Sequence, residues 1–244
     1  MKALILAAGR GERMRPLTDT TPKPLLAVHG KPLIEWHLEA LARGGVREVV
    51  INTAWLEQRI VDVLGDGTRF GLSIVYSREG RDHGGALETA GGLKKALPLL
   101  IDGGDTVFWY VAGDVYAPGF RFEADAIAQF LRSDELTHLW MVPNPPQHPG
   151  GDFGITGGHA TAGAEGARFT WSGIGLFRAS FVSELMVSLR VGEPARLRPY
   201  LDTAIAQGRL GAELYEGLWT DVGTPERLLE LNTALNTALN AAPR

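Results

Sequence analysis

The chain has 244 residues, of which 45% are hydrophobic and 21% charged, the composition of an ordinary globular protein. The absence of cysteine excludes disulfides and thiolate chemistry and favours a reducing cytoplasm. The formal net charge of −4 argues against nucleic acid as a partner, and no segment holds the roughly 18 consecutive apolar residues of a membrane helix. We therefore expect a cytoplasmic protein that binds neither nucleic acid nor membranes.

The first half of the chain alternates short apolar runs with helical patterns. The runs indicate buried strands, whereas the helical stretches carry apolar residues three or four positions apart. Strands are predicted over 3–6, 46–53, 72–76 and 106–111, and helices over 32–43, 56–64 and 93–100. This order predicts an α/β fold of parallel βαβ units, with helices on both faces of the sheet.

The second half is less regular. A loop rich in turn-forming residues, 143–151, follows a strand predicted over 136–142. A strand over 169–177 is interrupted at Ser172-Gly173, and a short hairpin is expected between 154 and 167. Helices are predicted over 122–132, 181–189 and 198–206, and a strand near 213–215. No linker is long enough to separate two domains, so we expect a single domain over residues 1–244.

The last helix is predicted to begin at Thr224-Pro225-Glu226, where a capping threonine precedes a proline in the first helical position. An apolar stripe follows along one face, formed by Leu228, Leu231, Leu235 and Leu239. We expect this stripe to pack on the chain's own domain, which predicts a monomer or a weak homodimer. The alternative is a dimer interface.

Positive charge is concentrated at the start of the chain. Residues 1–31 hold six lysines and arginines against two acidic residues. A compact basic segment in an acidic protein suits a small anionic ligand better than a long polyanion. A solvated basic face is the alternative that charge alone leaves open.

The loop after the first predicted strand has the residues of a phosphate site. Gly9 and Gly11 allow a tight turn whose N–H groups can bind an anion, and Arg10, Arg13 and Arg15 add guanidinium groups that match phosphate oxygens. The spacing excludes two better-known phosphate loops. A dinucleotide fingerprint needs a third glycine where methionine stands, and no P-loop motif occurs.

Lys23 stands between Pro22 and Pro24, whose fixed φ angles stiffen the loop that presents its ammonium group. A lysine in such a place can be a plain surface residue. Close to a glycine turn and three arginines, we expect it to contact phosphate.

Two aspartates stand at points where a strand ends. Asp114 follows the buried run 106–111 and Gly113, at the carboxyl end of a strand where a magnesium–phosphate complex fits. Asp221 stands between a late strand and the last helix. Taken alone, each aspartate is better explained as a turn or helix-entry residue.

The segment 6–26 resembles the signature L-A-A-G-x-G-T-R-[LM]-x-P-L-T…P-K-x-L-L of the sugar-phosphate nucleotidyltransferases over some twenty positions. The G-D at Asp114 and the W-T-D-V-G-T at Asp221 resemble two further motifs of this family. The resemblance implies a three-layer, Rossmann-like (GT-A-like) fold with a mostly parallel mixed sheet. It also implies an enzyme that joins a nucleoside triphosphate to a sugar 1-phosphate and releases pyrophosphate. The nucleotide-binding half would span about 1–115 and the sugar-binding half about 116–244.

The resemblance further implies roles for individual residues. Arg15, Lys23 and Asp114 would act on the reacting phosphates, and Asp114 and Asp221 would bind Mg²⁺. The nucleotide-binding residues implied are Ala8, Gly9, Gly11, Glu12, Arg13, Lys23, Thr89, Ala90, Gly91 and Ala112. Glu12 replaces the small residue that is usual in the family. A sugar phosphate is already anionic at neutral pH, so we expect neither a general base nor a covalent enzyme intermediate.

The segment Leu87–Gly92 and the stretches 144–153, 169–174 and 219–227 resemble the branch of the family that uses UTP and N-acetylmuramate 1-phosphate in peptidoglycan recycling. By this resemblance Asp152, Ser172 and Gly173 would contact the sugar. Within the family, the alternative is a mannose- or glucose-1-phosphate transferase that uses GTP or another nucleotide. Outside catalysis, the alternative is a regulator that only binds nucleotide sugars.

Overall fold

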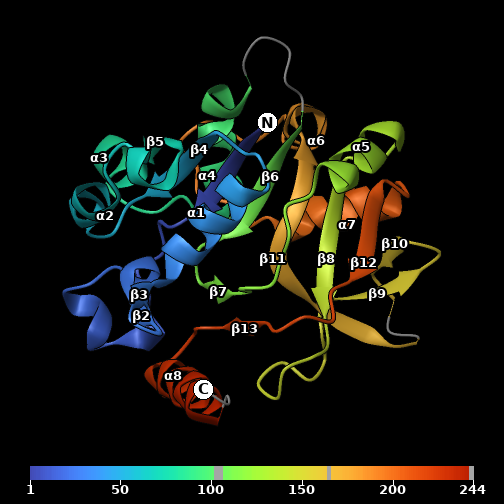
Figure 1. Ribbon diagram of the computed structural model, residues 1–244. Helices are drawn as coiled ribbons and strands as arrows, with labels where there is room; N and C mark the ends of the chain where they lie inside the picture. The colour runs from blue at the N-terminus through green and yellow to red at the C-terminus, as the bar shows by residue number, and fades with distance from the viewer. Residues whose placement is uncertain (102–106, 164–165, 242–244) are drawn as a thin grey trace.

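Four apolar runs of the first half form the parallel part of the central sheet. In the computed structural model, which describes residues 1–101, 107–163 and 166–241, β1 (Lys2–Leu6) pairs in parallel with β4 (Glu48–Thr53) and with β6 (Val107–Ala112). β5 (Ser73–Arg78) extends the sheet beyond β4, again in parallel. Parallel strands bring their carboxyl ends to one edge, the lower edge in Figure 1. Of the predicted strand 106–111, Thr106 lies outside the described residues.

The second half adds strands in both directions, so the whole sheet is mixed. Its described strands follow the order β5-β4-β1-β6-β11-β8-β12-β10-β9. β11 runs antiparallel to β6 and β8, whereas β12 runs parallel to β8. The strands of this half are β8 (Thr137–Val142), β9 (Phe153–Thr156), β10 (His159–Thr161), β11 (Arg168–Arg178) and β12 (Leu210–Leu214).

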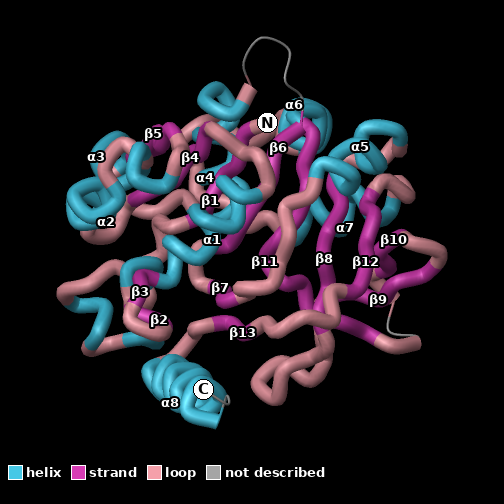
Figure 2. Tube along the Cα trace, viewed as in Figure 1, coloured by secondary structure: helices cyan, strands magenta, loops and turns pink. Residues whose placement is uncertain are grey.

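Helices cover both faces of the sheet (Figure 2). One face carries α1 (Leu33–Arg43), α2 (Glu57–Leu64) and α5 (Ala124–Arg132). The other carries α4 (Glu88–Leu100), α6 (Ala179–Leu185) and α7 (Arg198–Ala206). β1 shows the alternation that separates the two layers, because Ala3 and Ile5 pack into the first core cluster and Leu4 into the second. The α/β fold class with helices on both faces is therefore confirmed.

Element boundaries differ from the predicted ones in several places. α7 matches 198–206, but α4 begins at Glu88 rather than at 93, because its first turn is built from small residues that carry no apolar period. α6 spans 179–185 instead of 181–189, and Leu189 lies in a turn closed by its N–H on Met186. β12 begins at Leu210, three residues before the strand predicted near 213–215.

The predicted interruption of the strand at Ser172-Gly173 is confirmed. β11 shifts its register against β8 between Trp171 and Ile174, and Gly173 has a φ of +80°. A left-handed residue inside a strand marks a bulge, which re-aims the neighbouring side chains. The predicted hairpin between 154 and 167 is also present, formed by β9 and β10.

The C-terminal helix α8 (Pro225–Ala241) lies across the lower end of the molecule in Figure 1. Leu228, Leu231 and Leu235 pack against a small cluster that includes Met14 and Tyr116, so the stripe is covered by its own chain, as expected. Leu239 lies outside the described side chains. The remaining short elements away from the central sheet are α3 (Glu79–His83), η1 (Glu12–Met14), η2 (Leu17–Asp19), η3 (Lys23–Leu25), η4 (Thr68–Phe70), β2 (Ala27–Val28) and β3 (Lys31–Pro32).

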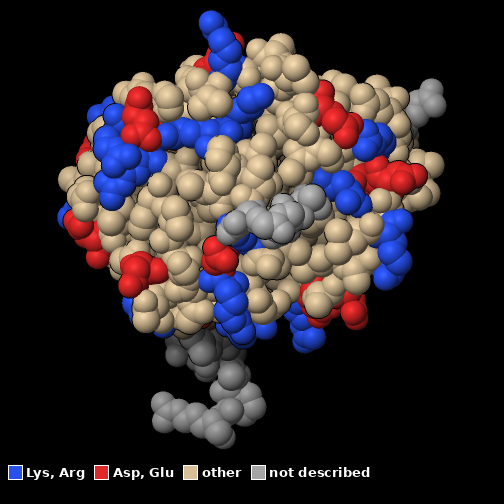
Figure 3. Space-filling view, turned by 90° about the horizontal axis from the view of Figure 1, so that it is seen from above, with Lys and Arg blue, Asp and Glu red and all other residues tan. Residues whose placement is uncertain are grey.

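The surface shows no segregation of charge on the face where β6 begins. Figure 3 looks onto this face, and the Lys and Arg side chains there lie interspersed with Asp and Glu. Within the described residues, no helix combines the length and the apolar composition needed to cross a membrane.

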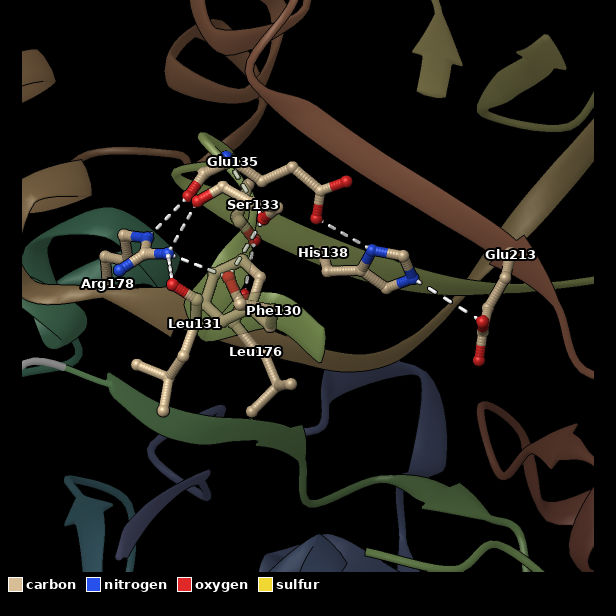
Figure 4. A network of polar contacts seen from close by, with 9 residues as sticks. Phe130, Leu131, Ser133, Glu135, His138, Leu176, Arg178 and Glu213 are labelled. Atoms are coloured by element: carbon tan, nitrogen blue, oxygen red, sulfur yellow. Dashed lines mark hydrogen bonds and ion pairs between the residues drawn. The ribbon is translucent and has the colours of Figure 1, made fainter. Parts of the chain in front are cut away.

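A polar network joins α5, β8, β11 and β12 (Figure 4). The guanidinium of Arg178 donates to the carbonyls of Phe130 (2.7 Å), Ser133 (2.9 Å) and Glu135 (2.7 Å), which closes the carboxyl end of α5. His138 lies between two carboxylates, 2.9 Å from Glu135 and 3.8 Å from Glu213. Burial alone would lower the pKa of His138, but the two glutamates outweigh it and raise the pKa to about 9.

This raised pKa predicts a pH-dependent contribution to stability. Because the folded state holds the His138 proton up to about pH 9, the contribution is complete below the unfolded pKa of about 6.5 and is lost as pH rises through 9. The measurement is chemical denaturation of the wild type and of His138→Asn at pH 6 and pH 9.5. We expect the difference in unfolding free energy to shrink by on the order of 2 kcal/mol between the two values. A difference that stays constant with pH would contradict the prediction.

Candidate functional site

A cleft of about 720 Å³ opens at the carboxyl ends of β1, β4 and β6. Open α/β sheets bind ligands at this edge, where the loops between strands and helices converge. Both halves of the chain line the cleft. The first half contributes the segment after β1, Asn52, the entrance to α4 and the end of β6. The second half contributes Pro145, Gln147, His148, Thr170, Trp171, Gly173, Trp219, Asp221 and Arg227.

The loop after β1 forms one wall of the cleft. Gly11 adopts a φ of +67° immediately before η1, so the chain turns back on itself there. Ala8, Gly9, Arg10 and Arg13 line the cleft, as the sequence predicted for an anion site. Arg13 makes no hydrogen bond or ion pair with the described part of the chain, which leaves its guanidinium available to a ligand.

Arg15 lies outside the cleft wall, although the sequence had predicted that it acts on the reacting phosphates. Its side chain is 57% exposed, donates to Asp19 at 2.8 Å and is absent from the cleft wall. The reason is local, because Asp19 at the end of η2 forms an ion pair with the Arg15 guanidinium and holds it outside the cleft. In the signature L-A-A-G-x-G-T-R the arginine falls on Arg13, so the sequence already held the better assignment.

Lys23 and Asp114 form the central ion pair of the cleft. The Lys23 ammonium donates to the Asp114 carboxylate at 2.6 Å, and the lysine side chain is only 11% exposed. Burial alone would raise the pKa of Asp114, but the charge and hydrogen bond of Lys23 outweigh it and hold that pKa below its ordinary value. The carboxylate is therefore ionised at neutral pH.

A buried histidine supports the chain directly after Asp114. His37 of α1 donates from Nε2 to the carbonyl of Val115 at 2.7 Å. Burial lowers the pKa of His37 to about 4, so the ring is neutral and its second nitrogen carries no charge. His37 therefore supports the backbone beside Asp114 through a single hydrogen bond.

Asp221 reaches the cleft through a short backbone pairing. β13 (Thr220–Asp221) runs antiparallel to β7 (Val115–Tyr116), and the N–H of Val222 donates to the Asp114 carbonyl at 2.9 Å. Gln147 donates to one carboxylate oxygen of Asp221 at 2.6 Å, and Arg227 forms an ion pair with the other. Two aspartates that are 107 positions apart therefore lie on the same cleft wall, each beside a cation.

The entrance of α4 divides the predicted nucleoside-binding residues. Thr89 lines the cleft, although its hydroxyl already accepts the Leu197 N–H at 2.8 Å. Ala90 and Gly91 are buried, and both of their N–H groups donate to the carbonyl of Ala195. The segment before α7 covers them, so the structure does not bring these two residues to the cleft.

Of the predicted sugar-binding residues, only Gly173 lines the cleft. It faces Ala112, because a Cβ at Gly173 would lie 2.7 Å from the Ala112 Cβ. Ser172 is buried, and its carbonyl accepts the indole N–H of Trp219 at 2.9 Å. Asp152 accepts the N–H of Trp171 at 2.8 Å, so in this structure it holds a residue of the cleft wall without lining the cleft itself.

The structure therefore separates the predicted residues into two groups. Those on the cleft wall are Ala8, Gly9, Arg13, Lys23, Thr89, Ala112, Asp114, Gly173 and Asp221. Those away from it are Gly11, Glu12, Arg15, Ala90, Gly91, Asp152 and Ser172. Sequence reasoning missed Asn52, Tyr110, Gln147 and Arg227, which line the cleft. Asn52 stands at the carboxyl end of a predicted strand, and that position was a usable signal.

Comparison with known proteins agrees with this geometry. Residues 2–157 match the family described as Nucleotidyl transferase. The chain is 47% identical over 234 residues to the N-acetylmuramate alpha-1-phosphate uridylyltransferase of Neisseria meningitidis, covering 94% of this chain and 96% of that protein. It is 29% identical over 245 residues to the protein of the same name from Caulobacter vibrioides, covering 97% of each.

The fold is shared as well. A Bacillus anthracis structure described as a putative glucose-1-phosphate thymidylyltransferase superimposes with a TM-score of 0.80 at 23% identity, covering 96% of this chain and 94% of that one. The family match spans well over half of the chain and includes the glycine loop, Lys23 and Asp114. The chain therefore belongs to the nucleotidyl transferase family, and it is an enzyme of the kind that transfers nucleotides to sugar phosphates.

Proposed function

We propose that the enzyme transfers the uridylyl group of UTP to N-acetylmuramate α-1-phosphate, giving UDP-N-acetylmuramate and pyrophosphate. The observation that carries the reaction class is the Lys23–Asp114 pair, held beside Asp221 in a cleft that Arg13 also lines. The choice of substrates is supported by the 47% identity to a uridylyltransferase with this activity, over nearly the whole of both chains. We also propose a place in peptidoglycan recycling in the cytoplasm, which is supported by the resemblance of 144–153, 169–174 and 219–227 to that branch of the family.

Asp114 and Asp221 are the proposed ligands of Mg²⁺. In the described residues no group of three or more His, Cys, Asp or Glu side chains could hold an ion, so a site built wholly from protein side chains is not offered. Two carboxylates fit Mg²⁺, which keeps several waters and binds substrate phosphates as its other ligands. When bound, the ion would neutralise charge on the triphosphate and on the leaving pyrophosphate.

The chain's own groups perform the remaining tasks. An oxygen of the sugar phosphate attacks the α-phosphorus of UTP, a new P–O bond forms there, and the bond to the β-phosphate oxygen breaks. The Gly9 turn, Arg13 and Lys23 hold the triphosphate in line and stabilise the developing charge. No proton has to be removed from the nucleophile, because the phosphate oxygen is already ionised.

The second half of the chain supplies the proposed sugar side of the cleft. Trp171 stacks on Tyr110 with ring centroids 5.4 Å apart, and Gln147 and His148 line the same wall. Asp152 and Ser172 fix this wall through Trp171 and Trp219. We therefore propose that residues 1–115 bind the nucleotide and 116–244 the sugar, within one domain. Mannose- or glucose-1-phosphate transfer with GTP is the alternative reaction, and nucleotide-sugar binding without turnover is the alternative outside catalysis.

Pyrophosphate release tests the reaction and its substrates. We expect release with Mg²⁺ only when UTP is paired with N-acetylmuramate 1-phosphate, and not with GTP or with mannose 1-phosphate. Asp114→Asn should lower kcat at least about a hundredfold, because a metal ligand and its charge are lost. Asp62→Asn, at an exposed carboxylate that pairs with Gln58 on α2, is the matched control and should leave kcat unchanged.

Each other outcome of this assay has a definite meaning. Turnover with a different nucleotide and sugar would leave the reaction class standing and overturn the choice of substrates. Nucleotide binding without turnover on any sugar phosphate would favour the regulator.

Arg13 and Arg15 form a natural matched pair of variants. Arg13 lines the cleft, where its charge acts on Asp114 but it makes no hydrogen bond or ion pair with the described part of the chain, whereas Asp19 holds Arg15 outside. Arg13→Gln should therefore raise the KM for UTP and lower kcat. Each of these changes is expected to be roughly tenfold or larger. Arg15→Gln should change either constant less than about threefold. Steady-state kinetics with UTP varied check this, and a larger effect at Arg15 would overturn the assignment.

A further inference from the structure

One end of the cleft lies between the end of β1 and the start of α4. A buried chain of hydrogen bonds, here called the bridge, joins these two walls. The N–H of Ala7 donates to Oδ1 of Asn52 at 2.6 Å, and Nδ2 of Asn52 donates to Oε1 of Glu79 at 2.7 Å. The other carboxylate oxygen of Glu79 accepts the N–H of Leu87 at 2.7 Å. The chain of contacts thus runs from the end of β1, through β4 and α3, to the residue that precedes α4.

The two side chains of the bridge are buried, which costs free energy, and of these two only Asn52 lines the cleft. Glu79 is 0% exposed and Asn52 is 2% exposed. Asn52 lines the cleft, whereas Glu79 does not and has no direct route to a ligand. A buried carboxylate is tolerated only where its hydrogen bonds are satisfied, and Glu79 satisfies its own with the two groups that it joins. Burial raises the pKa of Glu79, and the hydrogen bonds from Leu87 and Asn52 and the charge of Lys95 oppose that rise.

Gly92 shows independently that α4 is shaped around the bridge. A Cβ at this position would lie 2.6 Å from both Nδ2 of Asn52 and Oε1 of Glu79. Glycine inside a helix lowers helix stability by about 1 kcal/mol relative to alanine. The residue therefore makes room for the two side chains, and its φ is not among the positive values that would require glycine.

A strained residue directly follows the last contact of the bridge. Glu88, which follows Leu87, has a φ of +59° although it carries a side chain. Such a conformation persists only where neighbouring contacts fix it, and strained residues concentrate at ligand sites. Glu88 lines the cleft together with Ala86 and Thr89, opposite Ala7 and Ala8.

From these observations we infer that Asn52 and Glu79 are positioning residues for the nucleotide, because their bridge fixes the distance between the Ala7–Ala8 wall and the Ala86–Thr89 wall. The inference rests on the proposed function, since it takes the occupant of this cleft end to be the nucleoside of UTP. It does not concern the metal, the phosphates or the sugar.

The test replaces the carboxylate of Glu79, which only accepts hydrogen bonds, with an amide that also donates them. In Glu79→Gln, one N–H must face another N–H whichever way the two amides turn, because the bridge then has one acceptor too few. The double variant Asn52→Asp/Glu79→Gln restores all three contacts. The carboxylate introduced at position 52 accepts from the Ala7 N–H and from the amide introduced at position 79, while the carbonyl of that amide accepts from Leu87. The pair also keeps its single negative charge.

Calorimetric titration with UTP and steady-state kinetics are the readouts. We expect Glu79→Gln to weaken UTP binding and raise the KM for UTP at least about tenfold, with the KM for the sugar phosphate unchanged. The double variant should return UTP affinity to within about threefold of the wild type. Gly92→Ala should weaken UTP binding as Glu79→Gln does, despite alanine's higher helix propensity. Gly85→Ala, where a Cβ meets nothing within 4 Å, is its control.

Three results would overturn the inference. UTP binding by Glu79→Gln at wild-type strength would show that the bridge does not set the site. So would a double variant as weak as the single one, and so would equal rises in both KM values, which indicate general loosening. If the wild type itself prefers another nucleotide, the proposed function fails, and the same variants titrated with that nucleotide still decide the inference.

Discussion

The site depends on a backbone pairing only two residues long. β7 and β13 place Asp221 opposite Val115, and the Val222 N–H closes on the Asp114 carbonyl at 2.9 Å. Without this pairing, the late aspartate would have no fixed relation to a strand that ends more than a hundred residues earlier. α8 follows β13 directly and packs its leucines against Met14 and Tyr116, so apolar burial holds the pairing from outside.

Each carboxylate at this junction is already balanced by a cation of the protein. Lys23 pairs with Asp114, and Arg227 pairs with Asp221. Two unpaired carboxylates side by side would repel each other and favour a protonated state, which binds a metal ion poorly. The ion pair with Lys23 holds the pKa of Asp114 below its ordinary value before a ligand arrives. The two ion pairs also place two cations next to the position where phosphate charge is expected, so the same side chains serve the empty and the loaded cleft.

The sequence predicted elements and local motifs better than it predicted where side chains point. The order of strands and helices, α7 and the bulge at Ser172-Gly173 followed from apolar periods and glycine positions, because these are local properties. Arg15 and Ala90 were misplaced for a different reason. Asp19 captures Arg15, and the Ala195 carbonyl captures the N–H of Ala90. The signature motif could have separated Arg13 from Arg15, because its arginine falls on Arg13. The contact of Ala90 joins segments about a hundred residues apart, so it follows from no motif.

Several glycines of the family motifs have their explanation in these contacts rather than in backbone freedom. Gly92, Gly113 and Gly223 are not among the glycines with positive φ. A Cβ at Gly113 would lie 2.6 Å from the Leu6 carbonyl, and one at Gly223 would lie 2.8 Å from both Asp221 and Arg227. Gly92 and Gly223 therefore each stand where two polar side chains approach each other, and Gly113 stands where the backbone after β6 approaches the Leu6 carbonyl. The glycines of the G-D, D-V-G-T and A-G-G motifs are therefore needed because a side chain there would clash with the groups that hold the aspartates and the bridge. This explains why glycines mark the site in the sequence.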